Sequence, residues 1–432
     1  MDWVQSPRLS PRNPSKVCSA KAKLIMGHSR TTSHVKHCIL PYLLFVRYYT
    51  LGVTSELACP NVTTSVNNSD KDDTISTLMP LLNESSHILL CVLSHVAVAA
   101  LLSIRRSQKP PYASPTGSIR LPTVSVSAIR LAGFGCAVYT LAVPSQVLPD
   151  DVLSQPGLRC AAFFYACKLW SLTLANADSP PTLMSKSGGP SAKREYATMS
   201  SFEDHCRYIA YLLTEMRYSS FDIAVQQRGR PSSDTGTLST ISTWIPKVVI
   251  PLLVFILPSA EMKCLFLLLV IQTSLEALHT LFHFNRSSCT QPLFYKPFAA
   301  TSFTSFWTTH WHAAAAPFLQ TLGYRPGRQY VGRWFRVLAT FNITGIWHAW
   351  CAMPVVSSDH ALELGFRVWA MFMIMGLGIL VESLVPSHRQ GGLVQGVIVW
   401  AIALFSAGLA YKTLECYSKI DILRSETRVC AR

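Results

Sequence analysis

The sequence predicts an all-α membrane protein, a polytopic bundle of about eight or nine spanning helices with an additional amphipathic helix at the membrane interface. Hydrophobic residues make up 49% of the 432 residues and charged residues only 14%, whereas soluble domains carry about 25% charge. The apolar residues also gather into long runs instead of alternating with polar ones. A large soluble core is the weaker alternative.

Three regions follow one another along the chain. Residues 1–37 are basic and rich in Ser and Pro, and they predict a disordered cytoplasmic arm. Residues 38–412 form the membrane domain, and residues 413–432 form a polar tail. Two of the candidate spans are weak because they contain Arg47 and Lys168. The candidate spans are 39–53, 87–104, 127–148, 158–175, 244–258, 263–282, 337–353, 366–385 and 393–411.

Two independent signals orient the span at 87–104. Three glycosylation sequons, at Asn61, Asn67 and Asn83, lie before it in a polar stretch that we expect to be a lumenal loop. Arg105 and Arg106 follow it, which favours the cytoplasm on that side. We therefore expect an integral glycoprotein of the endoplasmic reticulum. Nine spans would leave the basic tail in the lumen, so the charge rule indicates that one span is miscounted.

The formal net charge of +15 could indicate nucleic-acid binding. The basic residues lie in loops between apolar runs, however, and no zinc-finger, RRM or helix-turn-helix pattern accompanies them. We expect no nucleic-acid partner. The 13 cysteines are scattered singly, which indicates small core residues and no metal site.

The first candidate site residue is His348, within the apolar run RWFRVLATFNITGIWHAWCAM. An ionisable side chain at membrane depth is costly and usually has a function, and imidazole exchanges protons near neutral pH. The alternative is a histidine packed against Trp347 and Trp350 whose nitrogens are satisfied by the backbone. The residue alone does not decide between the two.

A second polar and aromatic region precedes this run. If 302–316 is one helix, five side chains share a face, which predicts an interfacial helix: Phe303, Phe306, Trp307, His310 and Trp311. An aromatic anchor is the favoured interpretation of His310. His312 points elsewhere, and for it an anchor and a chemical role both stay open.

A basic collar follows, made of Arg325, Arg328, Arg333 and Arg336. Such a collar is usually a topology signal, but arginine also binds phosphates in a bidentate manner. Twelve helical residues separate Arg336 from His348, or roughly 18 Å, a reach comparable with the pantetheine arm of coenzyme A.

Two strings in this region resemble signatures of the wax-synthase-like family of membrane-bound O-acyltransferases. LFYKPFAATSFTSFWTTHWH resembles the signature in which a PF segment precedes Phe-Trp and then Trp-His, and NITGIWHAW resembles a Gly-hydrophobic-Trp-His in a membrane helix. The resemblance is strong over 285–352. The chain departs from the family in lacking an Arg-Gly-Ile-Gly-Trp-like element near 169–181 and in having His310 where a basic residue is usual.

The resemblance implies transfer of an acyl group from acyl-CoA, a co-substrate, to a hydroxyl of a lipophilic small molecule, with no permanently bound cofactor. Fungal members of the group suggest an acetyl group and a terpenoid or polyketide secondary metabolite, and a long-chain wax or sterol ester synthase is the alternative. His348 would be the general base, with Asn342 and His312 as further catalytic candidates. Thr344 would orient the other nitrogen of His348. Asn342 would donate to the carbonyl oxygen or make a helix-packing hydrogen bond.

Two other classes of protein were weighed. Glu276, His279 and His283 share a helix face, as in a di-iron hydroxylase or desaturase, but those enzymes resemble one another in having about eight histidines in several boxes. A transporter would line a path with His348, Glu276 and Glu382, but no internal repeat supports it.

Overall fold

The computed structural model describes residues 73–108, 123–147, 154–184, 199, 201–218, 220–223, 259–283, 293–294, 299–311, 314–326, 332–384 and 393–417. The long helices are α2 (Asp73–Ser107), α3 (Val126–Gln146), α4 (Ser154–Asn176), α5 (Phe202–Thr214), α7 (Ala260–His283), α11 (Arg333–Ala352), α12 (Ser358–Glu382) and α13 (Leu393–Tyr417). Short turns connect them: α8 (Phe303–Ser305), η3 (Phe306–His310), α9 (Ala316–Leu319), η4 (Gln320–Tyr324) and η5 (Met353–Val355). Within these residues the only β pairing is an isolated bridge between Leu183 and Phe221.

Within the described ranges, five helices are long and apolar enough to cross a membrane: α2, α3, α7, α12 and α13. The helix α4, which contains Arg159 and Lys168, and α11, which begins with two arginines, are also long but are not among the five. The predicted all-α class is therefore confirmed for the described residues, the apolar helices point to an integral membrane protein, and a count of eight or nine spans stays a prediction. The predicted spans 39–53 and 244–258 and the arm 1–37 lie outside the described residues.

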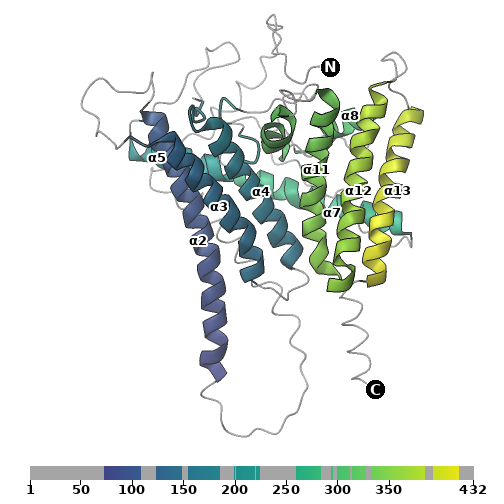
Figure 1. Ribbon diagram of the computed structural model, residues 1–432, viewed down its shortest axis with the longest axis horizontal. Coiled ribbons are helices and arrows are strands. Elements are labelled where there is room, and N and C mark those ends of the chain that lie inside the picture. The colour runs from purple at the N-terminus through teal and green to yellow at the C-terminus, as the bar shows by residue number, and fades with distance from the viewer. Residues whose placement is uncertain are drawn as a thin grey trace, which may run out of the picture.

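The helices form two groups (Figure 1), and α4 of the first group packs on α11, α9, η4 and η5. In the first group α3 packs between α2 and α4, and α5 packs on α2. In the second group α12 packs between α11 and α13, and α7 packs on α13. The contact between α4 and α11 joins the groups at the middle of the molecule.

The two groups share a common polarity. Arg105 and Arg106 end α2, and Arg333 and Arg336 begin α11. Both of these helix ends lie at the same end of the bundle (Figure 1). Such clustering of basic residues at one end is the pattern expected of a cytoplasmic face.

The helix α2 begins earlier than the sequence indicated. The polar stretch before residue 87 was expected to be a loop, but α2 starts at Asp73 and therefore includes Asn83. The apolar residues Ile75, Leu78 and Leu82 recur at spacings of three and four residues, which is the period of a helix. The sequons at Asn61 and Asn67 lie outside the described residues.

Glycines let α11 and α12 approach closely. A Cβ atom at Gly345 would lie 2.9 Å from Cδ1 of Trp369, and one at Gly376 would lie 3.0 Å from Cβ of Phe341. Small residues at such crossings are typical of membrane helix pairs, where close packing replaces the hydrophobic effect. This crossing positions the helix that carries His348.

Candidate active site

The ring of His348 is held by the backbone of its own helix. Its Nδ1 lies 2.8 Å from the carbonyl oxygen of Thr344, one turn earlier in α11. A carbonyl oxygen can only accept a hydrogen bond, so Nδ1 carries the proton in the neutral ring and Nε2 has a free lone pair. The expected role of Thr344 in orienting the ring is therefore filled by its backbone. Its hydroxyl instead donates to the carbonyl of Thr340 at 2.9 Å.

Two aromatic rings pack against the imidazole. The ring centroid of Phe372 in α12 lies 4.4 Å from that of His348, and the centroid of Trp347 lies 5.0 Å away. Trp347 is itself buried and stacks on Phe163 of α4. The half-buried His348 therefore lies where α11 contacts both α12 and α4.

Asn342 lies in the contact between α11 and α12. Its Oδ1 accepts a hydrogen bond of 2.9 Å from the indole Nε1 of Trp369, which is the helix-packing alternative that the sequence left open. Because six helical residues separate it from His348, it lies about 9 Å away along the axis. A catalytic role for Asn342 stays a prediction.

The predicted interfacial helix over 302–316 is wrong as a single element. The chain instead forms the single turn α8, the π-helical turn η3 and, after Trp311, a separate short helix α9. Phe303, Phe306 and Trp311 are buried in the helix bundle instead of lying on its surface. Aromatic packing against neighbouring helices overrides the simple helical period: Phe306 and Trp311 stack on each other at 5.1 Å, and Phe306 also packs edge-on against Trp400 of α13.

A carboxylate at the end of α12 holds the start of this segment. Glu382 accepts hydrogen bonds from the backbone N–H groups of Phe303 and Thr304 and from the hydroxyl of Thr304. The free N–H groups of a helix start favour an anion. This contact gives Glu382 a structural role, in place of the transport path that was the only role expected of it from the sequence.

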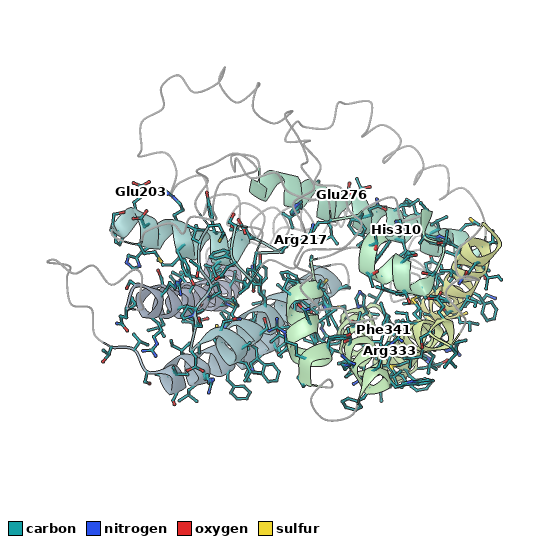
Figure 2. The ribbon with its side chains drawn as sticks, turned by 90° about the horizontal axis from the view of Figure 1, so that it is seen from above. Glu203, Arg217, Glu276, His310, Arg333 and Phe341 are labelled. Atoms are coloured by element: carbon teal, nitrogen blue, oxygen red, sulfur yellow. The ribbon has the colours of Figure 1, made fainter. Side chains whose placement is uncertain are left out.

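The structure describes only one of the two histidines in the first signature string. His310 ends η3 and is half-buried (Figure 2). His312 lies outside the described residues, and its chemical role stays a prediction. Short π-helical turns recur at functional sites; η3 lies within the first signature string, and η4 lies between the two strings.

The arginine collar is partly anchored. The guanidinium of Arg336 lies 5.0 Å from the ring centroid of Tyr324 in η4, and its Nη1 donates to the Tyr324 hydroxyl at 3.5 Å. Arg333 lies at the same end of α11, whereas Arg325 is exposed just after η4. Figure 2, which looks down on the bundle, shows Arg333 on the α11 side of the molecule and Glu203 of α5 at the opposite edge. Arg328 lies outside the described residues.

Lys168, whose charge made the candidate span 158–175 weak, binds backbone groups at the end of α5. Its side chain is buried, and its amine donates to the carbonyl oxygens of Leu213 at 3.0 Å and Glu215 at 2.7 Å. The amine therefore binds the carbonyls at the end of α5. The same amine borders a small, mainly apolar cavity with His95 and Tyr165, in the first group of helices and not beside His348.

The residues behind the metal alternative are only partly described. Glu276 and His279 of α7 are buried, whereas nothing is described of the His283 side chain. Within the described ranges, no group of three or more histidine, cysteine or acidic side chains is arranged to hold a metal ion.

Comparison with known proteins finds a family match, and it covers this part of the chain. No curated protein matches the chain. Residues 290–376, about a fifth of the chain, match the model of the membrane bound O-acyl transferase family. This matched part begins before α8, contains His310 and His348, and ends within α12.

Proposed function

We propose that this protein is a membrane-bound O-acyltransferase that uses acyl-CoA to esterify a hydroxyl of a lipophilic small molecule, with His348 as general base. The supporting observation is the immobilised imidazole: Nδ1 is committed to the carbonyl of Thr344, which leaves Nε2 as the proton acceptor. The family match over residues 290–376 supports the reaction class.

The reaction follows from that tautomer. The substrate hydroxyl oxygen forms a bond to the thioester carbonyl carbon while its proton passes to Nε2 of His348. The carbon–sulfur bond then breaks, and the imidazolium returns the proton to the departing thiolate. The products are an ester and free coenzyme A. Direct transfer needs no acyl-enzyme.

The collar supports the placement of the coenzyme. Arg333 and Arg336 begin the same continuous helix that carries His348. Their guanidinium groups would bind phosphates at the membrane surface, and the helix length of roughly 18 Å between Arg336 and His348 suits an extended pantetheine arm. Arg325 and Arg328 would extend this phosphate site.

The finer parts of the proposal are the donor, the acceptor and the compartment. We assign an acetyl donor and a terpenoid or polyketide acceptor from the family resemblance, and the endoplasmic reticulum from the sequons and the basic residues that flank the span 87–104. His312 would assist at the reacting centre.

Membranes supplied with acetyl-CoA and longer acyl-CoAs, each against a panel of lipophilic alcohols, report donor length and acceptor class together.

The decisive experiment replaces His348. With acyl transfer measured in membranes at matched expression, His348→Ala and His348→Gln should each lower kcat by roughly 100-fold or more. His360→Ala is the matched control, because His360 is a partly exposed histidine at the start of α12. Near-normal activity of both His348 variants would overturn the mechanism.

A further inference from the structure

Two cysteines from different helix groups meet beside the candidate site. The side chains of Cys160 in α4 and Cys351 in α11 interact with each other. Both thiols are free in this structure, Cys160 being exposed and Cys351 half-buried. They come together from positions about 190 residues apart in the chain.

Neighbouring contacts fix the register of the two helices at this point. Nη1 of Arg159 donates to the carbonyl oxygen of Trp350 at 3.1 Å, and its guanidinium lies 5.2 Å from the Trp350 ring centroid. One turn further along α4, Phe163 stacks on Trp347 with a centroid distance of 5.5 Å and an angle of 7°. Cys160 directly follows Arg159 and Cys351 directly follows Trp350, so the Arg159–Trp350 contact brings the two cysteine positions next to each other.

The thiols lie at the end of the bundle opposite the basic helix ends. Cys160 is near the start of α4 and Cys351 near the end of α11. In Figure 1 these helix ends lie opposite to the end that carries Arg105 and Arg333. If the basic end faces the cytoplasm, the thiols face the lumenal side, where oxidising conditions let disulfides persist.

We propose that Cys160 and Cys351 are a disulfide-forming pair that ties α4 to α11. In the reaction the two thiols lose two protons and two electrons, and a sulfur–sulfur bond forms between them. A small-molecule or protein disulfide accepts the electrons by thiol–disulfide exchange and is reduced to two thiols. The bond closes a long loop and fixes the end of α11 three residues beyond His348.

Peptide mass spectrometry tests the pairing. Membranes containing the full chain are treated with diamide, an azo oxidant that takes up the two hydrogens. Remaining thiols are then blocked with N-ethylmaleimide, and the protein is digested without reductant. We expect a linked peptide that joins Cys160 to Cys351 and disappears in both Cys160→Ser and Cys351→Ser. The matched control Cys167→Ser removes a buried thiol of α4 and should keep the link.

Recovery of both thiols as maleimide adducts after oxidation, or linkage of either to another cysteine, would overturn the proposal. A second measurement follows the tie itself. Oxidation should raise the melting temperature in detergent by about 5 °C, dithiothreitol should reverse the shift, and Cys351→Ser should show none. An equal shift in that variant contradicts the tie. Neither measurement depends on the proposed acyl transfer.

Discussion

Phe372 packs on His348 across the crossing of α12 and α11, with ring centroids 4.4 Å apart and planes at 38°. The backbone of Thr344 fixes one nitrogen of the imidazole, but a single hydrogen bond still allows the ring to swing. Phe372 removes that freedom because its buried ring occupies the space beside the imidazole. We therefore regard Phe372 as a positioning residue for the proposed base.

Replacing the Phe372 ring with a smaller side chain should disturb the alignment of the His348 imidazole more than the binding of acyl-CoA. We expect Phe372→Leu to lower kcat by about tenfold, because small displacements of a reacting group are costly, while KM for acyl-CoA changes little. The control is Phe366→Leu, since Phe366 lies on the same helix and is 64% exposed. Steady-state kinetics in membranes separate the two constants. A change confined to KM would contradict the positioning role.

The crossing itself depends on Gly345. A methyl group there would lie 2.9 Å from Trp369 Cδ1 and 3.2 Å from its backbone oxygen, and backbone cannot move aside easily. We expect Gly345→Ala to destabilise the protein by about 1–3 kcal/mol and to lower the melting temperature in detergent.

Gly135→Ala provides the opposite case. A Cβ atom at Gly135 in α3 meets nothing within 4 Å. That substitution should be neutral or should stabilise the helix by up to about 1 kcal/mol. Equal melting of the two variants would show that the glycine contact does not limit the approach of α11 to α12.

The long helices could be predicted from the sequence because a long apolar run is compatible with few structures other than a membrane-spanning or buried helix. The predicted span 158–175 is contained in α4, which runs from Ser154 to Asn176, even though it carries Lys168. The helix α5, which lies between the candidate spans 158–175 and 244–258, was not predicted. Its signal was present: Ser201 and Asp204 form a capping box, and Tyr208 and Leu212, four residues apart, are buried.

The candidate site was only partly predictable. The placement of His348 within a helix follows from the apolar run, and the local bond to Thr344 follows from one helical turn. The contacts of Asn342 with Trp369 and of Glu382 with Thr304 join residues that are 27 and 78 positions apart. Such pairs depend on the register between helices, which one sequence does not specify.

Glu382 should stabilise the first signature segment. Glu382→Gln removes the charge that accepts from the N–H groups at the start of α8, so we expect a loss of about 1–3 kcal/mol. Glu363→Gln is the matched control, because Glu363 pairs with Arg367 on an exposed face of the same helix, where ion pairs contribute little. Thermal melting in detergent checks the difference. Equal stability of the two variants would refute the capping role.

The collar should contribute to binding of the coenzyme and not of the alcohol. We expect Arg333→Gln with Arg336→Gln to raise KM for acyl-CoA severalfold, because the guanidinium groups would bind its phosphates, and to leave KM for the alcohol nearly unchanged. Arg130→Gln is the control, since Arg130 is an exposed arginine paired with Asp178 on the other helix group. Equal changes in both constants would mean that the collar serves only membrane topology.

Lys168 should be required for structure although its charged side chain is buried. Lys168→Met keeps the length of the side chain but leaves the carbonyls of Leu213 and Glu215 without their donor. An unsatisfied buried acceptor costs about 1–3 kcal/mol, so we expect a clear fall in melting temperature and faster amide exchange at the end of α5. Arg130→Met, which breaks an exposed pair, should have little effect. Removing a buried charge also removes its desolvation cost. An unchanged or higher melting temperature for Lys168→Met would mean that this cost outweighs the two hydrogen bonds. Lys168 would then not hold α5 in place.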